Sequence, residues 1–263
     1  MAQKKKSFYM LKLLNIAVII VVFIVNSLAN ALPIGGVTTG EVSALTPNLF
    51  TPAGLTFSIW GLIYLLQVVF LITQYRLDND SPWLEKIGYW YVILNLGNAT
   101  WLIAWHNQIF WLSEIIMLVI LVGLIMLYQR LGIGKKAYGP DEDNIKGGLF
   151  IPISVYFGWI SVATIANTAA LLTSIGWEGG AISEAAWAII MIVIATVLGF
   201  ILLVKKDDIY YTAVIVWALL GIAIKRLRAD TTNPGIGYIA IAFMVLLIVA
   251  AIFLEVKKRK KTE

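Results

Sequence analysis

Cysteine is absent from the 263-residue chain, and histidine occurs only once, as His106. Without thiols the chain has no disulfide framework, no cysteine nucleophile and no cysteine-ligated iron–sulfur or zinc site. A single histidine also excludes a histidine-rich metal centre. Charged residues make up 13%, against about 25% in soluble globular proteins, whereas 60% of the residues are hydrophobic. The composition therefore predicts an integral membrane protein whose main partner is the lipid bilayer.

Long apolar runs occupy most of the chain. A transmembrane helix needs about 20 predominantly apolar residues, and eight segments reach or approach this length. They predict an all-α, polytopic helical bundle of about eight transmembrane helices, at 11–32, 53–75, 87–105, 109–131, 149–172, 181–204, 209–224 and 236–256. The short run at 209–224 is the weakest of these, because charged residues bound it on both sides.

Basic residues predict the orientation of the bundle. With a cytoplasmic amino terminus, 17 of the 20 lysine and arginine residues lie on the cytoplasmic side, as the positive-inside rule requires. We therefore expect eight crossings of the plasma (cell) membrane with both termini in the cytoplasm. The net charge of +5 reflects this orientation, and no nucleic-acid partner is expected.

An alternative concerns the first apolar run. The lysines at 4–6, the run itself and the sequence Ala29-Asn30-Ala31 resemble a signal peptide with a small-residue cleavage site. Cleavage there would leave seven helices and an external amino terminus. The run is longer than a usual secretory core of about 7–15 residues, which favours a retained first helix.

The stretch 152–167 carries the clearest site pattern. Tyr156, Trp159, Ala163 and Asn167 fall at i, i+3, i+7 and i+11, so a helix aligns them on one face. Aromatic rings, a small residue and an amide suit a pocket wall for a flat, largely apolar molecule. We expect this face to contact protein or ligand rather than lipid.

Two further segments repeat this pattern. Phe57, Trp60 and Tyr64 share a face of the second apolar run, although an interfacial aromatic belt explains them equally well. In the third run two amides and two indoles share one side, and amides within a bilayer are costly unless neighbours satisfy them. These residues contact either a ligand or other helices through hydrogen bonds; they are Asn95, Asn98, Trp101 and Trp105.

These three segments together resemble the translocator protein family, also called tryptophan-rich sensory proteins (TspO/MBR), whose members have five transmembrane helices. The family pattern Tyr-x-x-Trp-x-x-x-Ala-x-x-x-Asn of the fifth helix is matched at all four positions from Tyr156 to Asn167. The third-helix pattern Leu-Asn-x-x-Trp is matched at Asn98 and Trp101, and Trp60 and Tyr64 have the separation found in the second helix. The resemblance covers about residues 11–172, so we divide the chain into a TspO/MBR-like five-helix bundle, 1–172, and three further helices with a basic tail, 173–263.

The resemblance implies a cavity that is closed by the first outer loop and binds porphyrins, other haem-pathway tetrapyrroles, sterols or synthetic drugs. The paired prolines of the family are Pro52-Ala53 here, Val155 replaces the proline beside the fifth-helix tyrosine, and Leu55 lies where the family has a loop tryptophan. This last difference counts most against porphyrin degradation or photochemistry. No obligatory cofactor is expected, and porphyrin or haem is expected only as a ligand. The chain could also form a homo-oligomer.

The remaining polar residues suggest weaker sites. Glu114 lies about one turn into the fourth run and Glu184 at the start of the sixth, both near the outer surface, where a hydrated carboxylate gains from the helix dipole. An outer basic cluster, Lys225, Arg226 and Arg228 with Asp230, could bind an anionic ligand or pair with Glu184. His106 is expected at the interface in a structural role. The outer segment 33–52, rich in glycine and proline, is expected to be a loop without helix that folds back as a lid.

Three classes of function follow. A membrane receptor, sensor or carrier for a flat hydrophobic ligand explains the three aromatic and amide faces best. A secondary transporter would usually have a charged residue near the bilayer midplane, and the eight runs place no acidic residue there. An intramembrane enzyme that modifies a porphyrin stays open as a third class.

Overall fold

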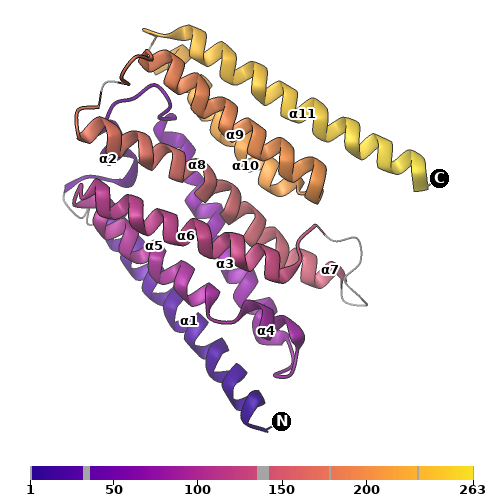
Figure 1. Ribbon diagram of the computed structural model, residues 1–263. Helices are drawn as coiled ribbons and strands as arrows, with labels where there is room; N and C mark the ends of the chain where they lie inside the picture. Colours follow the sequence, from indigo (N-terminus) through magenta and orange to yellow (C-terminus); the bar gives the residue numbers. More distant parts are fainter. Residues whose placement is uncertain (1, 32–35, 135–141, 178, 230, 263) are drawn as a thin grey trace.

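The computed structural model describes residues 2–31, 36–134, 142–177, 179–229 and 231–262, and these residues form a bundle of long helices (Figure 1). The long helices are α1 (Ala2–Ala31), α3 (Ile59–Arg76), α5 (Trp90–His106), α6 (Phe110–Leu131), α8 (Ile151–Ser174), α9 (Glu184–Lys206), α10 (Ile209–Ile224) and α11 (Pro234–Thr262). Short elements connect them: α2 (Thr39–Leu45), α4 (Pro82–Ile87), α7 (Glu142–Ile145), the 3₁₀-helix η2 (Gly54–Ser58) and the π-helical turns η3 (Lys146–Phe150) and η4 (Lys225–Ala229).

Each of the eight apolar runs forms a helix, so the predicted all-α membrane bundle is confirmed. Within the described residues, seven helical stretches are long and apolar enough to cross a membrane. The remaining run forms α5, which has 17 residues and so a length of about 25 Å, at the short end for a transmembrane helix. The weakest run, at 209–224, coincides with α10 and continues into η4.

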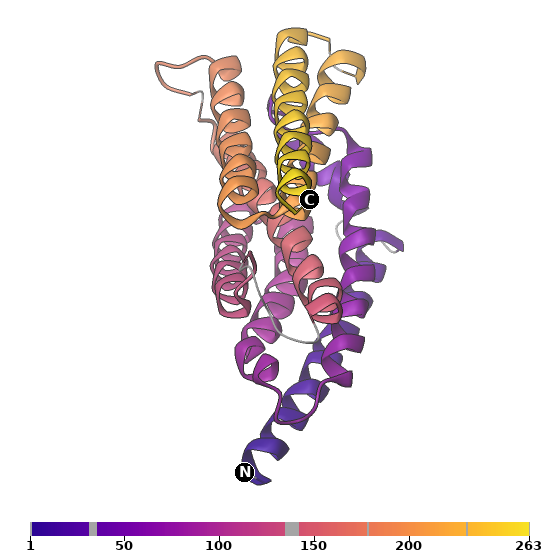
Figure 2. The ribbon, with the colours of Figure 1, turned by 90° about the vertical axis from the view of Figure 1, so that its right-hand side faces the viewer.

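Helix α8 lies at the centre of the bundle. It contacts α3 and α6 on one side and α9 and α10 on the other, and 15 of its 24 residues are buried. Figure 1 shows α9, α10 and α11 together on one side of the bundle, while α1 and α5 lie on the other; Figure 2 shows the same bundle turned by 90°. The chain ends near Ala2 and Thr262 lie at the same end of the bundle (Figure 1), as an even number of crossings requires.

The segment 33–52, called the first outer segment below, was expected to lack a helix, and the structure differs from this expectation. Residues 32–35 lie outside the described residues, but Thr39–Leu45 forms helix α2 where a loop without helix was expected. The cause is a capping box: the Thr38 amide donates to Glu41 Oε2 at 2.7 Å, and the Glu41 amide donates to Thr38 Oγ1 at 3.4 Å. Reciprocal bonds of this kind satisfy two amides at a helix start, and the sequence Thr-x-x-Glu carries that signal.

Candidate functional site

The three aromatic faces meet at Trp60, near the start of α3. Its indole stacks on Trp101 of α5, with 5.9 Å between ring centroids, and lies edge-on to Trp159 of α8 at 6.2 Å. Tyr64 stacks on the same indole at 5.7 Å, and Tyr156 approaches it at 6.2 Å. Aromatic pairs of this type contribute about 0.5–1.5 kcal/mol each beyond their buried area. Three helices therefore converge through the faces that the sequence spacing indicated.

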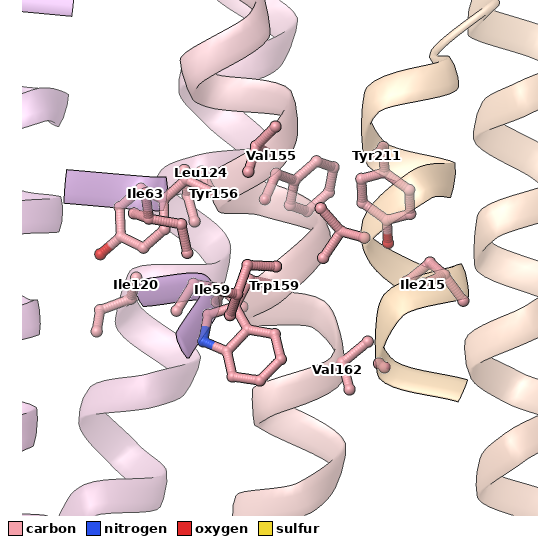
Figure 3. Close-up of a cluster of buried hydrophobic side chains, with 14 of the residues drawn as sticks. Ile59, Ile63, Ile120, Leu124, Val155, Tyr156, Trp159, Val162, Tyr211 and Ile215 are labelled. Atoms are coloured by element: carbon pink, nitrogen blue, oxygen red, sulfur yellow. The ribbon is translucent and has the colours of Figure 1, made fainter. Parts of the chain in front are cut away.

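The α8 part of this cluster is closely packed. Figure 3 shows Tyr156 and Trp159 among aliphatic side chains that include Ile59, Ile63 and Ile120. Tyr156 is 1% exposed and Trp159 is 3% exposed. Trp159 Nε1 has no hydrogen-bond partner within the described residues. The expected pocket wall on α8 is thus covered by neighbouring helices.

On its opposite side, α8 packs closely against α10. A Cβ atom added at Gly158 would lie 3.0 Å from the carbonyl oxygen of Tyr211, and the rings of Phe157 and Tyr211 are 5.0 Å apart. A small residue in such a position lets two membrane helices approach closely. Helix α10, which the five-helix pattern leaves out, therefore covers the second face of α8.

Asn167 is held by an interhelical hydrogen-bond network. Its Oδ1 accepts from Trp101 Nε1 at 3.0 Å, and its Nδ2 donates to Glu114 Oε2 at 2.8 Å. Thr168 Oγ1 donates to Glu114 Oε1 at 2.7 Å, and Ser113 Oγ lies 3.1 Å from Asn167 Nδ2. Glu114 is thus bonded to α8, because α6 packs against α8 at this level, rather than being only hydrated at a helix start.

The remaining predicted residues of α5 also have protein partners. Asn95 Nδ2 donates to the Tyr91 carbonyl of its own helix at 2.9 Å. Trp105 Nε1 donates to the Thr39 carbonyl at 3.1 Å, and this bond joins α5 to α2. His106 is fully buried, and its Nε2 lies 3.0 Å from Thr39 Oγ1. His106 ends α5, and α2 covers it through this contact with Thr39.

A cavity of about 940 Å³ lies beside the aromatic cluster, between α1, α3 and the first outer segment. Three of the predicted residues line it: Phe57, Trp60 and Tyr64. Trp60 belongs to the packed cluster, is 9% exposed and contributes to the cavity wall. The other eight predicted residues are not among its lining residues and lie behind or beside this wall: Asn95, Asn98, Trp101, Trp105, Tyr156, Trp159, Ala163 and Asn167.

Helix α1 also contributes to the cavity, through a residue that was not among those predicted. Asn26 lines the cavity, accepts a hydrogen bond from the Tyr64 hydroxyl and donates through Nδ2 to Asn98 Oδ1 at 3.4 Å. Asn98 is thereby connected to the cavity through Asn26. An amide inside an apolar membrane run is a functional candidate by itself, so Asn26 carried a usable signal.

The first outer segment forms another wall, and α10 holds it in place. Gly221 O accepts from the Ala53 amide at 3.0 Å, and Trp217 Nε1 donates to the Thr56 carbonyl at 2.9 Å. A Cβ atom at Gly221 would lie only 2.0 Å from Thr56 Oγ1. Lys225, just beyond α10, lines the cavity itself. Helix α10 and the turn that follows it therefore complete the cavity. The first 172 residues alone would leave part of its rim open.

The expected outer basic cluster is divided. Arg226 is only 2% exposed, and its guanidinium donates to the Asn48 carbonyl at 3.4 Å. Glu184 lies in the first turn of α9 and, among the described residues, makes no ion pair with Arg226. Asp230 lies outside the described residues. Burial of Arg226 leaves Lys225 as the member of the cluster that lines the cavity.

Comparison with protein families identifies the chain. Residues 12–253 match the family described as TSPO-like protein, and the match continues through α9 and α10 into α11. Comparison with curated proteins and with solved structures gives no significant match. The family match covers most of the chain, and the aromatic faces of α3, α5 and α8 agree with it. The protein therefore belongs to the TSPO-like protein family.

Proposed function

We propose that this membrane protein is a receptor or carrier that binds a flat, largely apolar ligand in the cavity beside Trp60. The observation that carries the proposal is the cavity of about 940 Å³ with Phe57, Trp60 and Tyr64 in its wall. Ligand pockets usually measure about 300–1,000 Å³ and combine apolar walls with a few polar groups. A porphyrin, another tetrapyrrole or a sterol-like molecule has the corresponding size and shape.

The wall is organised for a flat ligand before binding. Trp60 cannot turn freely, because Trp101 and Trp159 contact it from two sides. A ring that is already fixed loses little conformational entropy when a ligand stacks on it. Asn26 and the Tyr64 hydroxyl place polar atoms at the same wall. Apolar contact with Phe57, Trp60 and Tyr64, together with a polar contact to Asn26, is therefore the proposed binding mode.

Titration of the purified protein with protoporphyrin IX, followed by porphyrin absorbance, tests this proposal. We expect saturable binding, and Trp60→Leu should weaken it at least about tenfold, as for a buried aromatic anchor. Trp111→Leu is the matched control, because Trp111 is 60% exposed on α6 and is not among the cavity residues. Equal affinities of the two variants, or no saturable binding by the wild type, would refute the assignment.

A receptor and a carrier differ in whether the ligand crosses the membrane. Proteoliposomes with the porphyrin on one side only distinguish them, since a carrier accelerates its appearance on the other side. Trp60→Leu should abolish that acceleration if the same cavity is used. Binding without acceleration assigns the protein to the receptors.

A further inference from the structure

A second cavity, of about 430 Å³, lies at the end of the bundle that carries both termini, remote from the aromatic cluster. Residues from the end of α6, the start of α8, the α9–α10 connection and α11 surround it. Four lysines line it: Lys146, Lys205, Lys206 and Lys258. The proposed function of the outer cavity uses none of these residues.

The two acidic residues of this cavity are already occupied. Asp207 forms an ion pair with Lys258, which also contacts Glu255 at 2.6 Å. The Asp208 carboxylate, 3% exposed, accepts hydrogen bonds from the Ser154 hydroxyl at 2.7 Å and the Tyr128 hydroxyl at 2.9 Å. Both carboxylates are therefore neutralised or held by protein donors.

The other three lysines keep their charge available to a ligand. Lys146, Lys205 and Lys206 are exposed, and none of them makes an ion pair with another described residue. The backbone of Lys206 packs closely against Gly134, because a Cβ atom at Gly134 would lie 2.5 Å from the Lys206 carbonyl oxygen. Gly134 has a φ of +84°, a conformation that glycine adopts readily. Lys205 and Lys206 thus extend from a close contact between the ends of α6 and α9, whereas Lys146 belongs to η3.

The cavity also has an apolar wall. Phe150, Leu203, Val204 and Leu254 line it, and Val204 is 52% exposed on the outer surface of the bundle, where lipid chains would lie. Basic pockets between membrane helices on the cytoplasmic side suit anionic lipid headgroups. The junction of cationic and apolar walls places a headgroup beside the lysines and an acyl chain along Val204.

We infer that this cavity is a binding site for a phosphate-bearing anion, held by Lys146, Lys205 and Lys206, with an anionic phospholipid headgroup as its natural source. The ligand would contact Lys146 of η3, which leads into α8, and the other two lysines at the end of α9, and so connect the two parts of the bundle. A soluble phosphate ester carries the same phosphate group. Competition between such an ester and the lipid distinguishes the two sources.

Native mass spectrometry of the full chain with phosphatidylglycerol or phosphatidylcholine tests this inference. The wild type should retain phosphatidylglycerol preferentially, and Lys205→Gln with Lys206→Gln should weaken its retention about tenfold or more. Lys257→Gln with Lys260→Gln is the matched control, because it removes the same charge from exposed residues of α11 that do not line the cavity. Its effect should stay within about twofold.

Equal losses in the two double variants, or an unchanged affinity of the cavity variant, would overturn the inference, because either result means diffuse attraction by the basic tail. Unfolding temperatures in phosphatidylcholine alone verify that each variant is folded. Lys146→Gln tests the same cavity from a different helix should the double variant not fold. Displacement of the lipid by millimolar glycerol 1-phosphate would assign the site to soluble esters, and retention of the lipid would assign it to the headgroup.

Discussion

Trp101 and Asn167 are joined by a hydrogen bond of 3.0 Å from the indole Nε1 to the amide Oδ1. Both residues belong to the motifs from which the family resemblance was drawn, and both are buried, at 5% and 2% exposure. The bond connects α5 to α8 behind the cavity wall. It indicates that these two motif residues hold the helices in register, while Trp60 contacts the cavity.

The first prediction concerns this bond. Trp101→Phe removes the indole donor and should lower the free energy of unfolding by about 0.6–1.7 kcal/mol, the range for interhelical hydrogen bonds in membranes, with some additional loss of stacking on Trp60. Thermal or denaturant unfolding in detergent measures the change, with Trp111→Phe as the control. Unchanged stability together with lost porphyrin binding would instead make the pair a direct ligand contact.

The second prediction concerns the rim of the cavity. Gly221→Ala places a methyl group against Thr56, so η2 must move, and overpacking of this kind costs about 1–3 kcal/mol. We expect lower stability and weaker porphyrin binding. Gly235→Ala is the control, because nothing lies within 4 Å of its Cβ position. Recovery of binding in Gly221→Ala with Thr56→Gly, which removes the whole Thr56 side chain from the added methyl group, would verify the cause. Full binding by Gly221→Ala alone would contradict a rim held by α10.

The third prediction concerns the charge at the cavity. Lys225 lines it and can pair with a ligand carboxylate at the rim. Lys225→Gln should weaken binding of protoporphyrin IX about twofold to fivefold, in line with roughly 0.4–1 kcal/mol for a partly exposed ion pair. The dimethyl ester of the same porphyrin should bind both proteins equally. A similar loss for the acid and the ester would show that Lys225 acts through the shape of the cavity.

The fourth prediction concerns Asp208, which lies between α9 and α10. Burial raises the pKa of this carboxyl, and hydrogen bonds from Ser154, Tyr211 and Tyr128 only partly oppose that rise. The folded protein therefore binds the proton more tightly than the unfolded chain. The resulting stability is fully present below the unfolded pKa of about 3.9 and is lost as pH rises through the raised folded pKa.

Asp208→Asn should remove this pH dependence. Asparagine keeps an oxygen for Ser154 and remains a good residue to begin a helix, so the fold should be retained. Unfolding temperatures measured upward from about pH 4 should decline more steeply for the wild type than for the variant. Asp207→Asn is the neighbouring control, since Asp207 is exposed and begins no helix. Parallel profiles for the wild type and Asp208→Asn would contradict the raised pKa.

Sequence periodicity was sufficient to identify the residues that cluster around Trp60. Residues at i, i+3 and i+7 of a helix share a face whatever surrounds them, and amides within a bilayer face inward because lipid offers them no hydrogen-bond partner. These two local rules place Trp101, Trp159 and Asn167 in the interior. They do not distinguish a residue that contacts a ligand from one that contacts another helix.

The sequence by itself determined the membrane bundle, because helix length and apolar composition follow from the thickness and chemistry of the bilayer. It also determined which faces of α3, α5 and α8 turn inward. Only the tertiary structure decided that the open space lies beside Phe57, Trp60 and Tyr64, and that α1 and α10 complete it through Asn26 and Gly221. The reason is that a cavity is the volume left when side chains distant in sequence fail to fill a gap, and no local pattern encodes that sum.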